Sequence, residues 1–327
     1  MQRPDSSWDP FDDHVVDFAL ARLRAGERVA LVTLFSIDGA SPRPLGAQMA
    51  VTAAGESVGY LSGGCLESAV IAEAVEAMQA GENRLVRYGK GSRYLDIQLP
   101  CGSAIDLFFD VTTTLGDLER LDRQDRARQI STVEIGPAGG PHGPVLTRHY
   151  RPRPQLVVAG VGAAAVQLLR LAGVAGFATR LLSPDTPTQA AAMRDGILAL
   201  PVPRTGHAEA LAADARTAVV LMFHDHEWEQ ALLNAALASE AFYIGALGSR
   251  TTQQARRKRL LGEGFRAETV ARIRGPAGLF HGAKSASAIA VSILAEIMQA
   301  EQERFPALAT VAHPSTARDL ALPAHDF

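Results

Sequence analysis

Two cysteines carry the clearest chemical potential in this chain, and Cys65 and Cys101 are its only ones in 327 residues. Cys65 follows Ser62, Gly63 and Gly64, and an apolar-periodic segment that predicts a helix begins directly after it. Unpaired N–H groups and the dipole at a helix N-terminus favour an anion, which lowers a thiol's pKa below its free value of about 8.5. The glycines can expose further N–H groups as an anion nest. Cys65 is therefore either an ionised thiolate or a small residue packed in a crowded turn.

Cys101 lies in the turn LPCGS, beside Gly102, before a predicted strand. Its separation from Cys65 fits neither a C-x-x-C pair nor a zinc knuckle, so each thiol comes from a different loop. Two cysteines cannot build a disulfide framework, which favours free thiols in a cytoplasmic protein. Thiolates so placed suit a soft metal centre, nucleophilic chemistry or the carriage of sulfur.

A cation lies in the loop SPRPLG, where Pro42 and Pro44 fix the backbone on either side of Arg43. The guanidinium is thereby presented with little loss of conformational entropy. We expect Arg43 to hold an anionic ligand, and a stiff surface loop is the alternative.

A glycine turn marks the second half of the chain. Gly160, Gly162 and Ala165 form G-x-G-x-x-A between a predicted strand and a predicted helix. Because a Cβ would block both the tight turn and the approach of a phosphate, the pattern predicts a Rossmann-type fold. An acid usually follows the second strand to hold the ribose hydroxyls, but here Ser183 stands at that point and Asp185 comes two residues later. Whether this turn binds NAD(P) is therefore left open.

Two other strand ends in this half carry polar residues. His224 and Asp225 follow TAVVLMF, either as ligand-facing groups or as the cap of the next helix. Gly248, Ser249 and Arg250 follow AFYIGAL and combine backbone amides with a cation, which suits a phosphate or carboxylate. A plain helix start would look much the same.

The elements that must position these residues fall into two halves. The first reads as a helix over 12–25, short strands around glycine turns and the helix after Cys65. The second alternates strand and helix, which predicts parallel βαβ units. The expected class is α/β, with a C-terminal Rossmann-like doubly wound parallel sheet and a smaller N-terminal α/β domain.

We expect four segments: the N-terminal α/β domain with the cysteine motifs at 1–115, a helical then Gly/Pro-rich linker at 116–153, the Rossmann-like domain at 154–300 and a C-terminal tail at 301–327. An apolar helix near 285–300 either packs between domains or forms a homodimer contact.

Composition narrows the class of partner. A hydrophobic content of 47% and a charged content of 20% are ordinary for a globular protein with real cores. The net charge of −3 and the lack of Lys/Arg runs give no nucleic-acid signal. The acidic, proline-broken N-terminus is not a signal peptide, and no apolar run approaches the roughly 18 residues that cross a bilayer. We expect a cytoplasmic protein that binds neither nucleic acid nor membrane.

Six segments in order over nearly the whole chain carry a family resemblance: GASPRPLGAQMAV, GYLSGGCLESAV, LPCGS, the G-x-G-x-x-A turn, YIGALGSR and GPAGLFHGA…AIAVSILAEI. Together they resemble the XdhC/CoxI family, the accessory factors of xanthine dehydrogenase and of carbon monoxide dehydrogenase-type molybdoenzymes. The resemblance implies a chaperone, rather than a turnover enzyme, that binds the molybdenum cofactor (molybdopterin). It would protect the cofactor while a cysteine desulfurase supplies a terminal sulfido ligand, then deliver it to a xanthine dehydrogenase-type apo-enzyme.

The family's motifs fall on particular positions of this chain: the first cysteine motif on Ser62, Gly63, Gly64, Cys65 and Glu67, the second on Cys101 and Gly102, the proline–arginine loop on Ser41 to Gly46, and the Rossmann motifs on Gly160, Gly162 and Gly245 to Arg250. The resemblance makes Cys65 and Cys101 the chemically active residues. Cys65 is the candidate ligand to molybdenum, because soft thiolates suit such a centre. Arg43 and backbone amides would hold a phosphate or a pterin carbonyl, and a persulfide on one cysteine is a candidate sulfur carrier.

The chain departs from the family pattern at Ser103, His281 and Ser183, and its last helix begins KSASAIA, without the usual acid. Two other functions stay as alternatives. One is an NAD(P)-dependent oxidoreductase that uses the turn at Gly160, with His224 as the proton donor. The other is a non-catalytic protein that senses a nucleotide.

Overall fold

The computed structural model describes residues 8, 14–62, 64, 66–94, 102–137, 144–202, 208–223, 226–280, 282–305 and 308–312. The chain divides into two compact units. Unit 1 is Met1–Pro152 together with Ala307–Phe327, and unit 2 is Arg153–Pro306.

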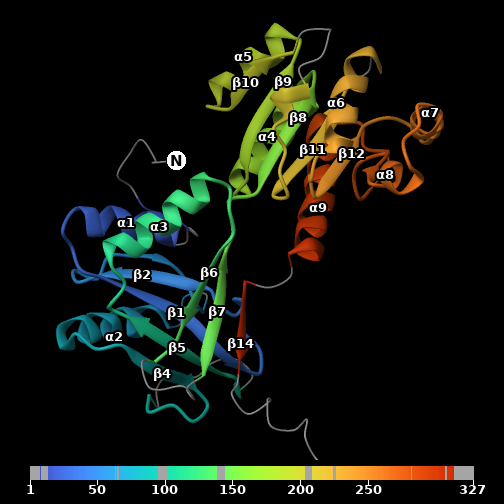
Figure 1. The fold of residues 1–327 in the computed structure, drawn as a ribbon. Helices are drawn as coiled ribbons and strands as arrows, with labels where there is room; N and C mark the ends of the chain where they lie inside the picture. Colours follow the sequence, from blue (N-terminus) through green and yellow to red (C-terminus); the bar gives the residue numbers. More distant parts are fainter. Residues whose placement is uncertain are drawn as a thin grey trace, which may run out of the picture. The chain divides into compact units, whose positions relative to one another are not determined.

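Unit 1 is built on a five-stranded sheet of order β3-β2-β1-β5-β4 (Figure 1). Its strands are β1 Val29–Asp38, β2 Gln48–Thr52, β3 Ser57–Gly59, β4 Arg84–Gly89 and β5 Ala104–Asp110. All neighbouring strands run antiparallel. The β1–β2 and β2–β3 pairs are each joined by a short glycine-containing connection, which antiparallel neighbours allow.

Helices cover both faces of this sheet: α1 Val15–Arg24 and α3 Leu115–Arg126 on one face, and α2 Glu67–Ala80 on the other (Figure 1). Along β1, Ala30 and Val32 pack with α2, whereas Val29 and Leu31 pack with α1. Because successive side chains of a strand point to opposite faces, burial on both faces explains why β1 reads as an unbroken apolar run.

A three-stranded antiparallel sheet of order β14-β7-β6 completes unit 1. Its strands are β6 Ser131–Ile135, β7 Val145–Tyr150 and β14 Ala309–Ala312. Leu146 and Ala309 pack against Phe35 and Phe108 of the five-stranded sheet.

This sheet differs from the expected linker at 116–153 and the expected tail from 301. The segment after 115 forms α3, which starts at a capping box of Thr114 and Asp117, and then the β6–β7 pair. The Gly/Pro-rich stretch is the connection within that pair. The chain also returns from unit 2 to supply β14, which is the last element that the structure describes.

Unit 2 holds six parallel strands in the order β10-β9-β8-β11-β12-β13. Numbered within the unit, this is the 3-2-1-4-5-6 order of a Rossmann fold. The strands are β8 Gln155–Gly160, β9 Ala178–Ser183, β10 Leu198–Pro201, β11 Thr217–Met222, β12 Tyr243–Ala246 and β13 Ile273–Arg274. The helices are α4 Ala163–Val174, α5 Thr186–Arg194, α6 His226–Ala238, α7 Arg250–Gly262, α8 Ala267–Ala271 and α9 Ala286–Arg304, with a 3₁₀ turn at Ala208–Leu211. The predicted doubly wound sheet is confirmed.

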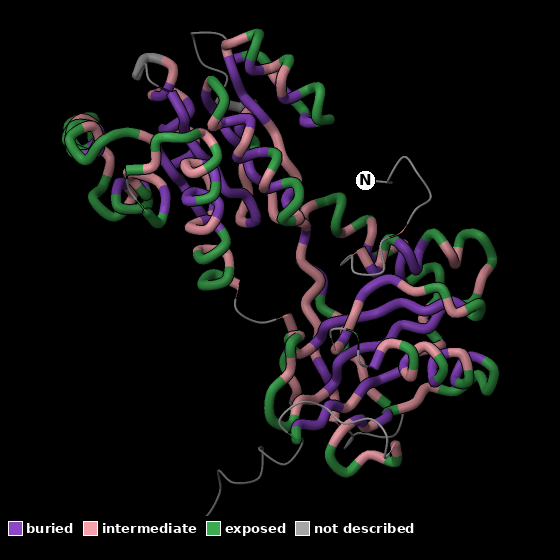
Figure 2. The backbone as a smooth tube through the Cα atoms, turned by 180° about the vertical axis from the view of Figure 1, so that it is seen from behind, coloured by how far each residue is buried: buried purple, intermediate pink, exposed green. Residues whose placement is uncertain are grey.

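The parallel sheet of unit 2 is buried between two helical layers, seen as the purple strands of Figure 2. Leu156 and Val158 of β8 pack with α4 and α9, and Val157 packs on the opposite side with α6. Helix α9, predicted near 285–300, packs Ile293, Leu294 and Ile297 into this core, whereas its Val291 and Met298 are exposed. Among the described residues, no helix is long and apolar enough to span a membrane.

Candidate functional site

The predicted site residues divide by what the structure describes. Outside the described residues lie Gly63, Cys65, Cys101, His224 and Asp225. Inside them lie Arg43, Ser62, Gly64, Glu67 and Gly102 of unit 1, and Gly160, Gly162, Ala165, Gly248, Ser249 and Arg250 of unit 2. The roles of the two thiols therefore stay predictions, and the structure shows what frames their segments.

The register of the five-stranded sheet brings three predicted segments to one end of it. Gly59, the last residue of β3, pairs beside the start of β2, and Ala104, the first residue of β5, pairs with both Asp38 and Gly89. Antiparallel neighbours exchange ends, so β1, β3 and β4 finish where β2 and β5 begin. The proline–arginine loop and both cysteine segments leave the sheet at this end.

Arg43 and Tyr60 connect two of these segments. The Arg43 guanidinium carbon lies 4.2 Å from the centroid of the Tyr60 ring, and Nη1 donates to the Tyr60 hydroxyl at 3.0 Å. A cation stacked on a tyrosine face is attracted by the ring quadrupole, which orients the guanidinium. Tyr60 is two residues before Ser62, so a fixed positive charge lies beside the segment that leads into the glycine–cysteine turn.

Close backbone packing fixes both segments. A Cβ on Gly59, whose φ is +94°, would overlap the Gln48 carbonyl oxygen and lie 2.7 Å from a methyl of Val15. At the end of the proline–arginine loop, Gly46 lies so close to β14 that a Cβ there would be 2.6 Å from the Cβ of Ala309. Side chains are excluded at both positions, so these loops start from a rigid base.

Glu67, the first residue of α2, closes the glycine–cysteine turn. Its carboxylate accepts hydrogen bonds from the N–H groups of Leu61, Ser62 and Leu66 at 3.3, 3.0 and 3.1 Å, and from the Ser62 hydroxyl at 2.9 Å. The Ser62 oxygen also accepts from the Leu66 N–H at 3.0 Å. Burial raises the pKa of Glu67, but the hydrogen bonds led by those from Ser62 outweigh it, and the net pKa is lowered.

Ser62 and Glu67 were predicted to bind cofactor, whereas the structure directs their polar groups at each other. Of the Ser62–Gly64 N–H groups that the anion nest would offer, that of Ser62 already binds the Glu67 carboxylate, as do the N–H groups of Leu61 and Leu66. The negative charge that a helix N-terminus favours is thus supplied by the chain itself. These bonds fix Ser62 and Glu67 against each other, and cofactor binding by the two residues stays a prediction.

A buried carboxylate anchors the segment that leads toward Cys101. Glu73 of α2 is 3% exposed and accepts from Arg84 at 2.7 Å, from Arg93 at 2.8 Å and from the Tyr94 hydroxyl. Burial raises its pKa, but these three donors outweigh it and lower the pKa overall. The Tyr94 ring also stacks on Tyr88 at 5.2 Å. Helix α2 therefore begins just after Cys65. Through Glu73 it also holds Arg93 and Tyr94, which lead into the segment of Cys101.

Sequence reasoning missed Glu73 because no motif contains it. The available signal was the position of Glu73 on the apolar face of α2. It lies on the same face as Val70 and Ala77, which form part of the core. An acid at such a position needs buried partners.

Ser103 stands where the family often has a second glycine, and the structure accommodates it. Its side chain is buried, and a Cβ on Gly39 would lie 3.1 Å from the Cβ of Ser103. Gly39 thus leaves the space that Ser103 fills. The preceding Gly102 has a φ of +66°, which favours glycine at this turn.

The glycine turn of unit 2 has structural reasons for its residues. A Cβ on Gly160 would lie 2.5 Å from the carbonyl oxygen of Met222, so glycine allows β8 to pack beside the end of β11. Gly162 has a φ of +88°, and Ala165 is fully buried in the core under α4. These residues confirm the Rossmann prediction without requiring a ligand.

The polar groups at this turn bind each other. The Gly162 N–H donates to the Thr188 hydroxyl at 2.9 Å, and that hydroxyl donates to Asp185. Asp185 also caps α5 by accepting the Thr188 N–H at 2.9 Å. In a dinucleotide site the turn amides hold pyrophosphate and the acid holds the ribose. Here Thr188 occupies one of those amides and the nearest acid.

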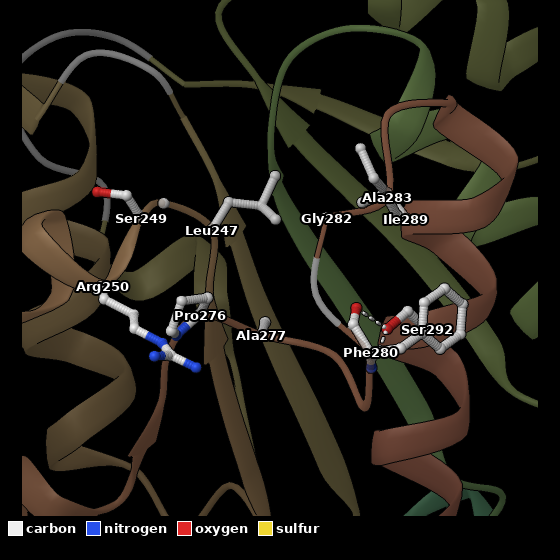
Figure 3. A pocket seen from close by; sticks show the side chains of 11 residues that line it. Leu247, Ser249, Arg250, Pro276, Ala277, Phe280, Gly282, Ala283, Ile289 and Ser292 are labelled. Carbon is white, nitrogen blue, oxygen red and sulfur yellow. Dashed lines mark hydrogen bonds between the residues drawn. The ribbon is translucent and has the colours of Figure 1, made fainter.

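A cavity of about 280 Å³ lies where β12 and β13 end (Figure 3). It is lined by Leu247, Gly248, Ser249, Arg250, Pro276, Ala277, Phe280, Gly282, Ala283, Ile289 and Ser292. The Ser249 hydroxyl caps α7 by accepting the Thr252 N–H at 3.1 Å, as in a plain helix start. The predicted Gly248–Arg250 cluster thus has a structural role and also borders a space that can hold a ligand.

Metal ligation by clustered side chains is absent from the part of the chain that the structure describes, where no three His, Cys, Asp or Glu residues come together. Both cysteines lie outside that part, so the prediction of Cys65 as a molybdenum ligand is untouched.

Two family models match the chain. The model of the XdhC and CoxI family covers residues 22–89, which include the proline–arginine loop and the first cysteine motif. The model of the XdhC Rossmann domain covers residues 156–297, which include nearly all of the parallel sheet. The chain belongs to the XdhC and CoxI family. The resemblance drawn from the six motifs is confirmed.

Individual relatives agree with this assignment. The molybdenum cofactor insertion chaperone PaoD of Escherichia coli is 33% identical over 300 residues, which cover 88% of both chains. A Bacillus subtilis protein, named as a probable component of xanthine dehydrogenase, is 26% identical over 85% of this chain and 95% of its own length. A crystal structure from Bacillus halodurans, described as a xanthine dehydrogenase, superposes with a TM-score of 0.72 at 22% identity, over 88% of this chain and 96% of that one. This last likeness shows the fold.

Proposed function

We propose that this chain is a chaperone that binds the molybdenum cofactor and inserts it into a xanthine dehydrogenase-type enzyme. PaoD, which covers most of this chain, is named for that insertion activity. The observation that carries the proposal is the convergence of the proline–arginine loop and both cysteine segments at one end of the unit 1 sheet.

The chemistry at this end suits such a cargo. Arg43, held on the Tyr60 ring, supplies a positive charge for the phosphate of a pterin cofactor. Thiolates from Cys65 and Cys101 are the soft ligands that a molybdenum–sulfur centre prefers. The carboxylates of Glu67 and Glu73 hold the two cysteine segments through bonds within the chain. Anion and soft metal would thus be bound by different residues.

The same proposal includes further details. The chain protects the cofactor during sulfuration by a cysteine desulfurase and delivers it to the apo-enzyme. It acts in the cytoplasm and catalyses no turnover of its own. For an NAD(P)-dependent oxidoreductase the structure offers little support, since Thr188 binds both the turn amide and the nearest acid. Its candidate proton donor, His224, lies outside the described residues.

The test is to purify the chain from a host grown with molybdate and to measure bound molybdenum and oxidised pterin. Wild-type protein should retain both, Cys65→Ala should lose them, and Arg43→Ala should retain at least fivefold less. Arg126→Ala removes an exposed arginine of α3 and serves as the matched control, with wild-type retention expected. Wild-type retention by Cys65→Ala would exclude the thiol role.

A further inference from the structure

The cavity of unit 2 has one side that carries a cation and an opposite side that is mostly apolar. Leu247, Ser249, Arg250 and Pro276 line one side, and Phe280, with Ile289 and Ser292 of α9, lines the other (Figure 3). It lies at the carboxyl ends of β12 and β13, the edge of an open α/β sheet where ligands collect.

The position of Arg250 is unfavourable for the stability of its own helix. It is the first residue of α7, where the helix dipole disfavours a positive side chain. The residue is exposed, and among the residues that the structure describes it forms no ion pair. An unneutralised guanidinium at the mouth of a cavity is suited to a phosphate or carboxylate.

Hydrogen bonds hold the far wall in place. Ser292 of α9 accepts from the Phe280 N–H and donates to the Phe280 carbonyl, both at 3.0 Å. Glu296, one turn further along α9, accepts from the Gly278 N–H at 2.6 Å and from the Tyr243 hydroxyl at 2.7 Å. The Phe280 side chain stays 48% exposed although its backbone is fixed. An aromatic side chain kept at the surface by its backbone is available to stack on a flat ring.

The near wall rests on a buried ion pair. Arg256 of α7 pairs with Glu229 of α6, and both side chains are almost fully buried. Arg256 also donates to the Leu247 carbonyl at 3.0 Å and to the side chain of Gln253. A Cβ on Gly275 would overlap the end of that Gln253 side chain, so glycine lets Gln253 keep this position. The cavity is therefore preformed, which lowers the entropic cost of binding.

The volume limits the occupant. Drug-sized ligands occupy pockets of roughly 300–1,000 Å³, and this cavity of about 280 Å³ lies just below that range. This volume matches one ring system with a phosphate. The usual dinucleotide turn at Gly162 already gives its amide to Thr188.

We propose that this cavity binds a small phosphorylated ring compound of mononucleotide size. Its phosphate pairs with Arg250, and its ring lies between Leu247, Ile289 and Phe280. The proposal concerns unit 2 alone and does not depend on the cofactor role of the cysteine segments.

The experiment is calorimetric titration of the full wild-type chain with AMP, GMP, CMP and UMP, and separately with adenosine and inorganic phosphate. At least one mononucleotide should bind, and it should bind at least tenfold more tightly than adenosine or phosphate. Arg250→Ala should weaken that binding at least tenfold. Ile289→Trp should fill the cavity and abolish binding, and Ala283→Trp fills it from another side should the first variant fail to fold.

Arg257→Ala, an exposed arginine of α7 that does not line the cavity, is the matched control and should bind as wild type does. The proposal is overturned when no mononucleotide binds at millimolar concentration, or when binding survives in Arg250→Ala or in a folded cavity-filling variant. Bound molybdenum is not read in this assay, so its failure and the failure of the chaperone role are distinguishable.

Discussion

Glu67 puts a negative charge at the N-terminus of α2, two residues after Cys65 in the chain. Its carboxylate accepts three backbone N–H groups there, and its pKa is lowered because those bonds and the Ser62 hydroxyl outweigh its burial. Glu67 is therefore ionised throughout the range in which a thiol titrates. We expect the helix dipole to favour a thiolate at Cys65 and this carboxylate to oppose one. The expected reactivity of the thiol then depends on both effects.

Replacing the carboxylate tests that balance. In a Cys101→Ala background, Glu67→Gln removes the neighbouring anion, so the Cys65 thiolate becomes easier to form. The midpoint of the pH dependence of iodoacetamide alkylation should fall by roughly half a pH unit, the size expected for the loss of one screened like-charge interaction. Glu76→Gln, an exposed glutamate further along α2, should leave the midpoint unchanged. A midpoint that stays or rises in Glu67→Gln would show that charge at this position does not control the thiol.

At the scale of elements, the strands and helices that the sequence predicted are those whose own residues show a local pattern. The buried strands β1 and β8 read as apolar runs, and α9 read as an apolar helix, because their own residues make the core. Strand β14 was missed because it pairs with β7, far away in the chain, and four residues carry no readable period. The Gly/Pro-rich stretch between β6 and β7 hid a strand pair because its turn signals dominate the sequence.

The candidate site shows the same division. The motifs around Arg43 and the two cysteines were recognisable from residue types. Their convergence depends on the antiparallel register of five strands, which no local pattern encodes. The contact of Arg43 with Tyr60 follows from that register, whereas the use of Thr188 at the turn of Gly162 follows from the packing of unit 2.

Strand β3 is short, and its last residue decides how the chain enters the glycine–cysteine turn. Gly59→Ala would push a methyl group into the Gln48 carbonyl and strain a φ of +94°. Gly81→Ala at the end of α2 introduces comparable strain at a φ of +72°, but no described atom lies within 4 Å of the new Cβ. The steric difference should make Gly59→Ala at least about 2 kcal/mol more destabilising than Gly81→Ala. Urea unfolding of both variants measures this, and equal losses would contradict the close packing at β3.

At the scale of the whole chain, unit 2 is an insertion between two strands of unit 1. The chain leaves unit 1 after Pro152, builds the Rossmann sheet and returns to form β14. Strand β14 pairs with β7, where the His149 N–H donates to the Leu308 carbonyl at 2.8 Å. It also contacts Gly46, whose carbonyl accepts from Arg148 at 2.7 Å. The last strand thus supports the loop that presents Arg43.

Truncation after Phe305 should therefore damage unit 1, although the cut lies at the end of unit 2. Without β14 the edge of β7 is uncovered, and hydrogen exchange at the His149 amide should accelerate at least tenfold, while Val157 and Val219 in the Rossmann sheet keep their protection. Truncation after Ala312 keeps β14 and is the matched control, with exchange as in the full chain. Because Gly46 loses its neighbour Ala309, the shorter chain should also retain less cofactor. Unchanged exchange at His149 would mean that β7 is held without β14, and the support of the Arg43 loop would have to come from the five-stranded sheet alone.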